Sequence, residues 1–396
     1  MKQKIWNTVS CLLILALLAG NIAQFQLSRK DYSKLEQLSD LIDEKFIGEA
    51  DPTALDDAAA AAMIAATGDR WSFYTSAADA ESFQEQMDNA YVGIGITIQM
   101  TEEQDGFLVL KVNPGGPAEE AGILPGDVLV EAAGQRIEGL DLTEGRNLVK
   151  GPEGTEVEIR IRRDGQEIPM TVERRSIETV VAEGRMVTEE IGLVSILNFD
   201  TRSSEETIAA IEELRSQGAE KLIFDVRFNP GGFVHELVKT LDYLLPEGDL
   251  IRTQDYRGRE NLDVSGPEFL DMPMAVLVNR DSYSAAEFFA AAMQEYEAAV
   301  IVGEKTSGKG YFQITYMLKD GSSVNLSSGK YFTPKGVCLQ DVGIVPDVEI
   351  SVDEETELGI LTQTVEDSLD AQLQAAIQAL EGAPRHLEVQ TVSDAA

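Results

Sequence analysis

The 396-residue sequence has few of the residues that build disulfide frameworks and metal sites. It contains two cysteines, Cys11 and Cys338, and two histidines, His235 and His386. Two cysteines far apart in the chain argue against a disulfide framework or a thiolate metal site, and two histidines are too few for an ordinary histidine-rich one. We therefore predict no metal and no cofactor, and only one plausible histidine base.

Basic residues are also scarce. The chain has 32 lysines and arginines against 69 aspartates and glutamates, a formal net charge of −37. Such an acidic surface argues against nucleic acid or an anionic membrane surface as a partner. The length and the 43% hydrophobic content predict a globular protein with two or three cores.

An apolar run extends from Ile5 to about Phe25, after Lys2 and Lys4. This length can span a bilayer. No clean small-x-small cleavage site ends the run, so an uncleaved anchor is favoured over a cleaved signal peptide. Positive residues flank both ends, so charge does not determine the orientation.

The most informative stretch is residues 279–313. A strand pattern before it, MAVLV at 274–278, leads to Ser282 and Ser284 and then to a helical pattern that ends near Met293. A second apolar strand pattern precedes Lys309, whose flanking glycines let the backbone pass close to a neighbour. The pattern places a serine at a strand-to-helix turn and a lysine where it can meet that serine.

Ser284 and Glu287 also have the spacing of a capping box, which would satisfy two backbone amides without any chemistry. Capping and catalysis are compatible, because a helix N-terminus stabilises negative charge that develops nearby.

Gly303 to Lys309 matches a phosphate-binding loop except at its last position, where Gly310 replaces Ser or Thr. Residues 311–317 then have a strand pattern, whereas a phosphate loop must open a helix. Nucleotide binding is therefore not favoured.

Residues 90–175 consist of short alternating strand patterns separated by glycine- and proline-containing turns. Together with the segment PAEEAGILPGD, the loop that begins at Tyr91 resembles a PDZ domain. Its glycines leave backbone amides free to hold a terminal carboxylate while a peptide adds a strand. We predict a reader of apolar C-termini, with the peptide-binding residues Val92, Gly93, Ile94, Gly95 and Ile96.

From Ser176 onward the pattern is βαβ-like, and connections through helices predict a largely parallel, buried sheet. The expected strands are 191–197, 221–227, 274–278 and 299–302, and the expected helices are about 204–217, 233–245 and 285–297.

The serine and lysine stretch resembles the carboxyl-terminal processing peptidases, or tail-specific proteases, of serine peptidase family S41. Their serine and lysine stand in N-x-x-S-x-S-A-x-E and G-K-G-x-x-Q, and the resemblance runs from about residue 30 to 380. It implies that Ser284 is the nucleophile, that Lys309 is its base and that Gln313 orients the lysine. It also implies an oxyanion hole formed by the amides of Gly232 and Ala285, although a simple turn at Gly232 is the other interpretation.

The resemblance implies a mixed α/β fold: a ClpP/crotonase-like protease core with an inserted PDZ β-domain and helical N- and C-terminal segments. It also implies a homodimer formed through the N-terminal helical region. The expected organisation is a membrane anchor or signal segment at 1–28, a helical region at 29–89, the PDZ domain at 90–175, the serine protease core at 176–353, and a C-terminal helix and mobile tail at 354–396.

The predicted function is a serine endopeptidase with a Ser-Lys dyad that recognises proteins or peptides with free apolar C-termini. Burial of Lys309 among apolar strands, Tyr311 and Phe312 would lower its pKa towards the working range. His235, three residues after Gly232, is the rival base. The expected location is a single-pass protein of the cell membrane with its catalytic body on the extracytoplasmic side, or a secreted protein after signal cleavage.

Four positions depart from the family pattern: Tyr283, Ala286, Tyr311 and Phe312. They predict a narrower or more aromatic pocket beside the lysine. They also keep open a different class of protein, a catalytically silent, membrane-tethered PDZ scaffold.

Overall fold

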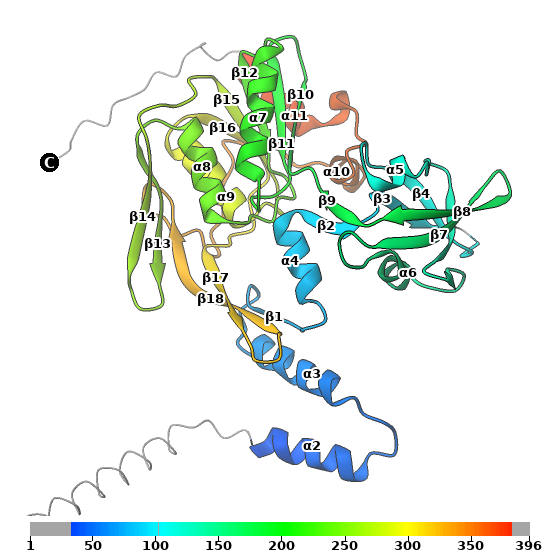
Figure 1. Cartoon of the computed structure of the whole chain (residues 1–396). Helices are drawn as coiled ribbons and strands as arrows, with labels where there is room; N and C mark the ends of the chain where they lie inside the picture. The colour runs from blue at the N-terminus through cyan, green and yellow to red at the C-terminus, as the bar shows by residue number, and fades with distance from the viewer. Residues whose placement is uncertain (1–32, 102, 382–396) are drawn as a thin grey trace, which may run out of the picture. The chain divides into compact units, whose positions relative to one another are not determined.

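The computed structural model describes residues 33–101 and 103–381 (Figure 1). The described chain divides into two units, of which the first ends at Thr67 and the second begins at Gly68. The described part of the first unit contains helices α2 (Ser33–Lys45) and α3 (Pro52–Ala65). The Asp51 carboxylate accepts a hydrogen bond from Thr53 N at 2.9 Å, and proline occupies the first turn of α3. Both features favour a helix start. The predicted helical N-terminal segment is therefore present.

The predicted transmembrane anchor and the membrane location derived from it are contradicted. Within the described residues, no helix combines the length and the apolar character needed to cross a bilayer. The longest described helices, α3 and α7 (Ser203–Ser216), have 14 residues each. At about 1.5 Å per residue they fall well short of a hydrocarbon layer about 30 Å thick. The run at 5–25, where the anchor was predicted, lies outside the described residues.

The PDZ fold is built on a sheet of order β3-β4-β5-β7-β8, with β6 paired to β5. Alternation along β7 explains its core: Val157, Ile159 and Ile161 are buried, whereas the charged residues between them face outward. A separate two-stranded sheet joins the strands that enter and leave this fold, β2 and β9. The elements are β2 (Ala90–Gly93), β3 (Ile96–Met100), β4 (Phe107–Val112), α5 (Pro117–Glu120), β5 (Val128–Ala132), β6 (Gln135–Arg136), α6 (Leu142–Val149), β7 (Glu156–Arg163), β8 (Gln166–Glu173) and β9 (Arg175–Glu178).

A six-stranded sheet of order β10-β11-β12-β15-β16-β19 forms the centre of the following fold, and every pairing after β10-β11 is parallel. Helices α7, α8 and α9 supply residues to one core, and α11 supplies residues to another. Along β12, Leu222 and Phe224 belong to the first core and Ile223 to the second. Because both faces are covered, the strands are continuous apolar runs, as the sequence predicts.

The elements of this fold are β10 (Ala182–Met186), β11 (Ile191–Ile196), α7, β12 (Lys221–Asp225), α8 (Val234–Leu244), β15 (Met274–Val278), α9 (Ala285–Glu295), β16 (Ala299–Gly303), β19 (Val348–Glu349), α10 (Glu354–Leu361), a 3₁₀ turn η1 (Asp367–Leu369) and α11 (Ala371–Glu381). The expected strands and helices agree with these to within a few residues. The mobile tail predicted after residue 382 lies outside the described residues.

A second sheet has the order β1-β18-β13-β14, with β17 paired to β18. Its strands are β1 (Phe73–Thr75), β13 (Gly248–Asp255), β14 (Glu260–Ser265), β17 (Tyr311–Met317) and β18 (Ser323–Phe332), and helix α4 (Ala80–Asp88) follows β1. The sequence pattern predicts that residues 29–89 are helical, and strand β1 shows that this prediction is wrong at residues 73–75. A three-residue strand has no periodicity of its own, and its hydrogen bonds come from β18, about 250 residues away in the chain.

Candidate active site

Ser284 stands between β15 and α9 in a strained backbone conformation, with φ 58° and ψ −123°. A non-glycine residue at positive φ costs about 1–3 kcal/mol and persists only where its surroundings hold it. Here the Glu287 side chain accepts a hydrogen bond from Ser284 N at 3.0 Å, so the predicted capping box is present. A serine on a sharp strand-to-helix turn is typical of nucleophiles in hydrolases.

The two serines of this turn have different surroundings. Ser282 is fully buried, and its hydroxyl donates to Val226 O at 2.7 Å and accepts from Asn279 N at 3.0 Å. Ser282 therefore ties the turn to the end of β12. Within the described part of the chain, the Ser284 hydroxyl donates no hydrogen bond, which leaves its proton free for transfer to a base.

Lys309 presents a largely buried amine beside two aromatic rings. Its Nζ lies 4.9 Å from the ring centroid of Trp71 and 5.5 Å from that of Tyr283, and these rings are 5.4 Å apart. Burial lowers the pKa of Lys309 to about 8, while the carboxylates of Glu287 and Asp69 act in the opposite direction. A substantial fraction of the amine is therefore neutral near pH 8.

Of the two rings beside the amine, Tyr283 is one of the positions expected to make the pocket aromatic, whereas Trp71 was not predicted. Phe312, which was predicted to bury the amine, packs against Tyr331 with ring centroids 5.1 Å apart. Trp71 comes from a distant segment, where the Asp69 side chain accepts a hydrogen bond from Trp71 N at 3.2 Å. In the sequence, Trp71 is visible only as a large aromatic residue that follows the turn residues Gly68 and Asp69. This local pattern does not indicate that its ring packs beside Lys309.

Glu287 connects the serine turn to the lysine loop. Its side chain is 0% exposed. Besides Ser284 N, it accepts hydrogen bonds from Thr306 Oγ1 at 2.6 Å, Gly308 N at 2.7 Å and Lys309 N at 2.7 Å. The sequence indicates only the first of these contacts, because the other three cross from the helix to a loop that follows the next strand. One carboxylate thus positions both candidate catalytic residues.

Replacing Glu287 with alanine should lower the free energy of unfolding by about 3 kcal/mol or more, because several buried donors lose their acceptor. Urea denaturation measures this change. Glu295→Ala is the matched control, since Glu295 lies on the same helix, is half-buried and accepts from Thr333 Oγ1 and Lys335 N. A cost for Glu287→Ala no larger than that of the control would contradict the role assigned to Glu287.

Two glycines bring a backbone loop against the serine. A Cβ on Gly231 would lie 2.7 Å from Ser284 Cβ and 2.8 Å from Ala285 N. A Cβ on Gly232 would lie 2.3 Å from the Phe199 carbonyl carbon, and both glycines have positive φ. No other residue fits these positions without backbone movement. The amides of Gly232 and Ala285 donate no hydrogen bond to any described group, so both are available to an anion.

Gln313 lies on β17, and its Nε2 donates to Tyr311 O and to Ser327 Oγ, both at 3.0 Å. No hydrogen bond joins it to Lys309 among the described residues, so its orienting role stays a prediction. His235 has a side chain that is 65% exposed and stacks on Phe233 with ring centroids 5.3 Å apart. The rival base therefore faces solvent.

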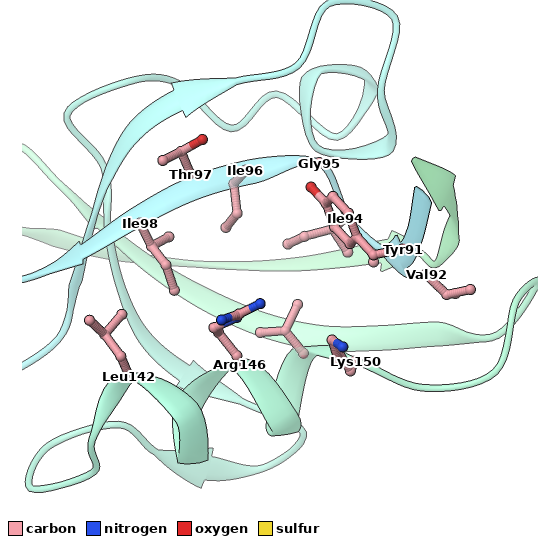
Figure 2. A pocket seen from close by; sticks show the side chains of 12 residues that line it. Tyr91, Val92, Ile94, Gly95, Ile96, Thr97, Ile98, Leu142, Arg146 and Lys150 are labelled. Atoms are coloured by element: carbon pink, nitrogen blue, oxygen red, sulfur yellow. The ribbon is translucent and has the colours of Figure 1, made fainter. Parts of the chain in front are cut away.

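The PDZ fold contains a groove of about 390 Å³ between β3 and α6 (Figure 2). All five residues predicted to bind peptide line it. Ile96 and Ile98 point from β3 towards α6, whereas Thr97 points away (Figure 2). Leu142 and Val149 of α6 line the opposite wall. The groove therefore offers apolar walls beside an exposed strand, as strand addition by a peptide requires.

Comparisons with known proteins agree with this architecture. Residues 190–350 match the model of peptidase family S41, and residues 108–163 match a PDZ domain. A probable CtpA-like serine protease of Staphylococcus aureus (strain COL) is 31% identical over 340 residues, covering 85% of this chain and 68% of that protein. The carboxy-terminal processing protease CtpA of Bacillus subtilis (strain 168) is 30% identical over 334 residues, covering 83% of this chain and 71% of that protein.

Among solved structures, a photosystem II D1 C-terminal processing protease is 25% identical and has a TM-score of 0.48, covering 89% of this chain and 92% of that chain.

The fold and the sequence matches together define a serine-type peptidase that carries a PDZ domain. The chain belongs to peptidase family S41, the carboxyl-terminal processing serine proteases. Its substrates are accordingly proteins or peptides.

Proposed function

We propose that this enzyme cleaves peptide bonds with Ser284 as the nucleophile and Lys309 as the general base. The observation that carries the proposal is the Glu287 carboxylate, which holds the amides of both residues in one buried site. A hydroxyl whose proton is not already donated and an amine with a pKa of about 8 suit this division of roles.

In the proposed reaction, Ser284 Oγ attacks the carbonyl carbon of the substrate while its proton passes to Lys309 Nζ. The Gly232 and Ala285 amides stabilise the negative oxygen of the tetrahedral intermediate. The carbon–nitrogen bond then breaks, and the leaving amine takes the proton from Lys309. Water hydrolyses the acyl-enzyme by the same route, with Lys309 as its base.

Gln313 is proposed to orient the lysine amine. Its Nε2 is already held by two acceptors, and its Oε1 accepts no hydrogen bond among the described residues. That oxygen can therefore accept a hydrogen bond from Lys309 Nζ and direct the nitrogen lone pair.

We also propose that the PDZ groove recognises free apolar C-terminal tails. The support is the row of apolar side chains along β3 and α6, next to a glycine-containing loop with Gly95 at φ 79°. A peptide would add as a strand along β3, and its terminal carboxylate would lie at the loop.

Amidation of the substrate's C-terminus should lower kcat/KM at least tenfold, because a neutral amide loses the charge-assisted hydrogen bonds made by a carboxylate. The experiment incubates the protein with an unfolded substrate that ends in apolar residues, as free acid and as amide, and follows the products by mass spectrometry. Equal cleavage of the two forms would contradict tail recognition. Binding of the free tail without any turnover would indicate a scaffold rather than a protease.

A further inference from the structure

A second hollow of about 420 Å³ adjoins the PDZ groove and shares three lining residues with it, Tyr91, Arg146 and Lys150. Its other wall is formed by α4, the helix that precedes β2, through Glu85 and its neighbours. The two hollows therefore meet beside Lys150. In Figure 2, Lys150 follows the end of α6, across the groove from Val92.

Glu85 reaches from α4 to this junction. Its Oε1 accepts a hydrogen bond from Val92 N at 3.3 Å, and its Oε2 pairs with Lys150 Nζ at 2.5 Å. The Glu85 and Lys150 side chains are 17% and 26% exposed, so the pair is partly shielded from water. The Glu85 carboxylate therefore already binds the Val92 amide and the Lys150 ammonium group. Both groups lie at the end of the groove where the carboxylate of a peptide is proposed to bind.

Glu85 is an acidic residue in an otherwise basic part of the surface. Although the whole chain has a net charge of −37, the residues that line the two hollows include Arg146 and Lys150, and their only acidic member is Glu85. Arg146 has no ion pair among the described residues. The lining is therefore locally basic, and it becomes more so when Glu85 moves away. Complementary charge of this kind favours a carboxylate ligand.

We propose that Glu85 acts as an internal competitor for the terminal carboxylate of the substrate tail and so sets how tightly the groove binds that tail. This inference depends on the proposed tail recognition. A tail with a free carboxylate replaces Glu85 at Lys150 and at the Val92 amide, so the ion pair is exchanged rather than lost. A substrate tail that ends in a neutral group, or an internal loop of a substrate protein, has no carboxylate to offer. If such a ligand displaces Glu85, Lys150 is left without a partner. Glu85 therefore lowers the affinity of every ligand that displaces it, and only a ligand that brings its own carboxylate restores the ion pair at Lys150.

The test measures binding of a fluorescein-labelled decapeptide that ends in Leu-Val-Ala, as free acid and as amide, by fluorescence anisotropy. The protein is the full chain with Ser284→Ala, which prevents cleavage of the probe. Glu85→Gln in this background removes the charge but keeps the size of the side chain. We expect the free acid to bind about 3- to 10-fold more tightly to Glu85→Gln, because no internal carboxylate then competes for Lys150.

The control Asp88→Asn makes the same charge change on α4 at a residue that lines neither hollow, and it should leave both affinities unchanged. In a Lys150→Met background, Glu85→Gln should give a smaller gain, because the competition for Lys150 is then absent and only that at the Val92 amide remains. Circular dichroism verifies that each variant is folded. Equal affinity of the Glu85→Gln and parent proteins for the free acid overturns the role of Glu85 alone. Absence of binding by every variant overturns tail recognition, and the role of Glu85 with it.

Discussion

Replacing Ser284 with alanine should lower kcat/KM for peptide hydrolysis by about 10⁴-fold or more. The hydroxyl supplies the only atom proposed to bond to the substrate, and the oxyanion amides alone provide the residual rate. KM should change little, because the side chain is small and substrate binding is assigned to the groove. Initial rates with an unfolded protein substrate measure both constants. Intact-mass spectrometry after rapid quenching should find an acyl adduct on the wild type and none on the variant.

Ser282→Ala is the informative comparison for this experiment. The Ser282 hydroxyl makes three buried hydrogen bonds that hold the turn, so its removal should lower the thermal stability. It should still form the acyl adduct. An adduct that persists in Ser284→Ala and disappears in Ser282→Ala would transfer the nucleophile to Ser282 and reject the proposed dyad.

Replacing Lys309 with methionine should lower kcat by about 10³- to 10⁴-fold, since methionine keeps an unbranched apolar stem and removes the amine that accepts the proton. The wild-type pH profile tests the same role. Burial lowers the pKa of Lys309 to about 8, and only the neutral amine can act as a base. Below pH 8 the activity should therefore fall about tenfold per pH unit, and above pH 8 it should level off.

His235→Ala is the control for the lysine experiment. Its side chain is mainly exposed, so the variant should retain both the rate and the pH profile of the wild type. Loss of activity in His235→Ala together with a retained rate in Lys309→Met would make the histidine the base.

Prediction from sequence was most successful where a feature depends on neighbouring residues. The residue pattern of each strand reflects which of its faces are buried. Strands β12 and β15 are continuous apolar runs and β7 alternates, so the strands and the fold class follow from local patterns. The capping box at Ser284 and Glu287 is likewise local. The serine motif, the lysine motif and the PDZ loop could be recognised because their residues are close together in the chain.

The environment of the lysine could not be predicted in this way. Trp71 lies more than 200 residues before Lys309, yet its ring lies closer to the amine than that of Tyr283. The same segment places β1 against β18. No periodicity links such distant residues, so the sequence could not indicate that Trp71 lies beside the lysine.

By itself, the sequence determined the class of fold, the serine and lysine candidates and the location of the PDZ loop, because periodicity and short motifs are properties of consecutive residues. Only the tertiary structure decided that Glu287 holds the serine turn and the lysine loop together, and that Glu85 pairs with Lys150 at the groove. The hydrogen-bond partners of a carboxylate in the fold are the donor groups that folding places within about 3 Å of it. The chain order does not encode that distance, so these two carboxylates became informative only in the folded molecule.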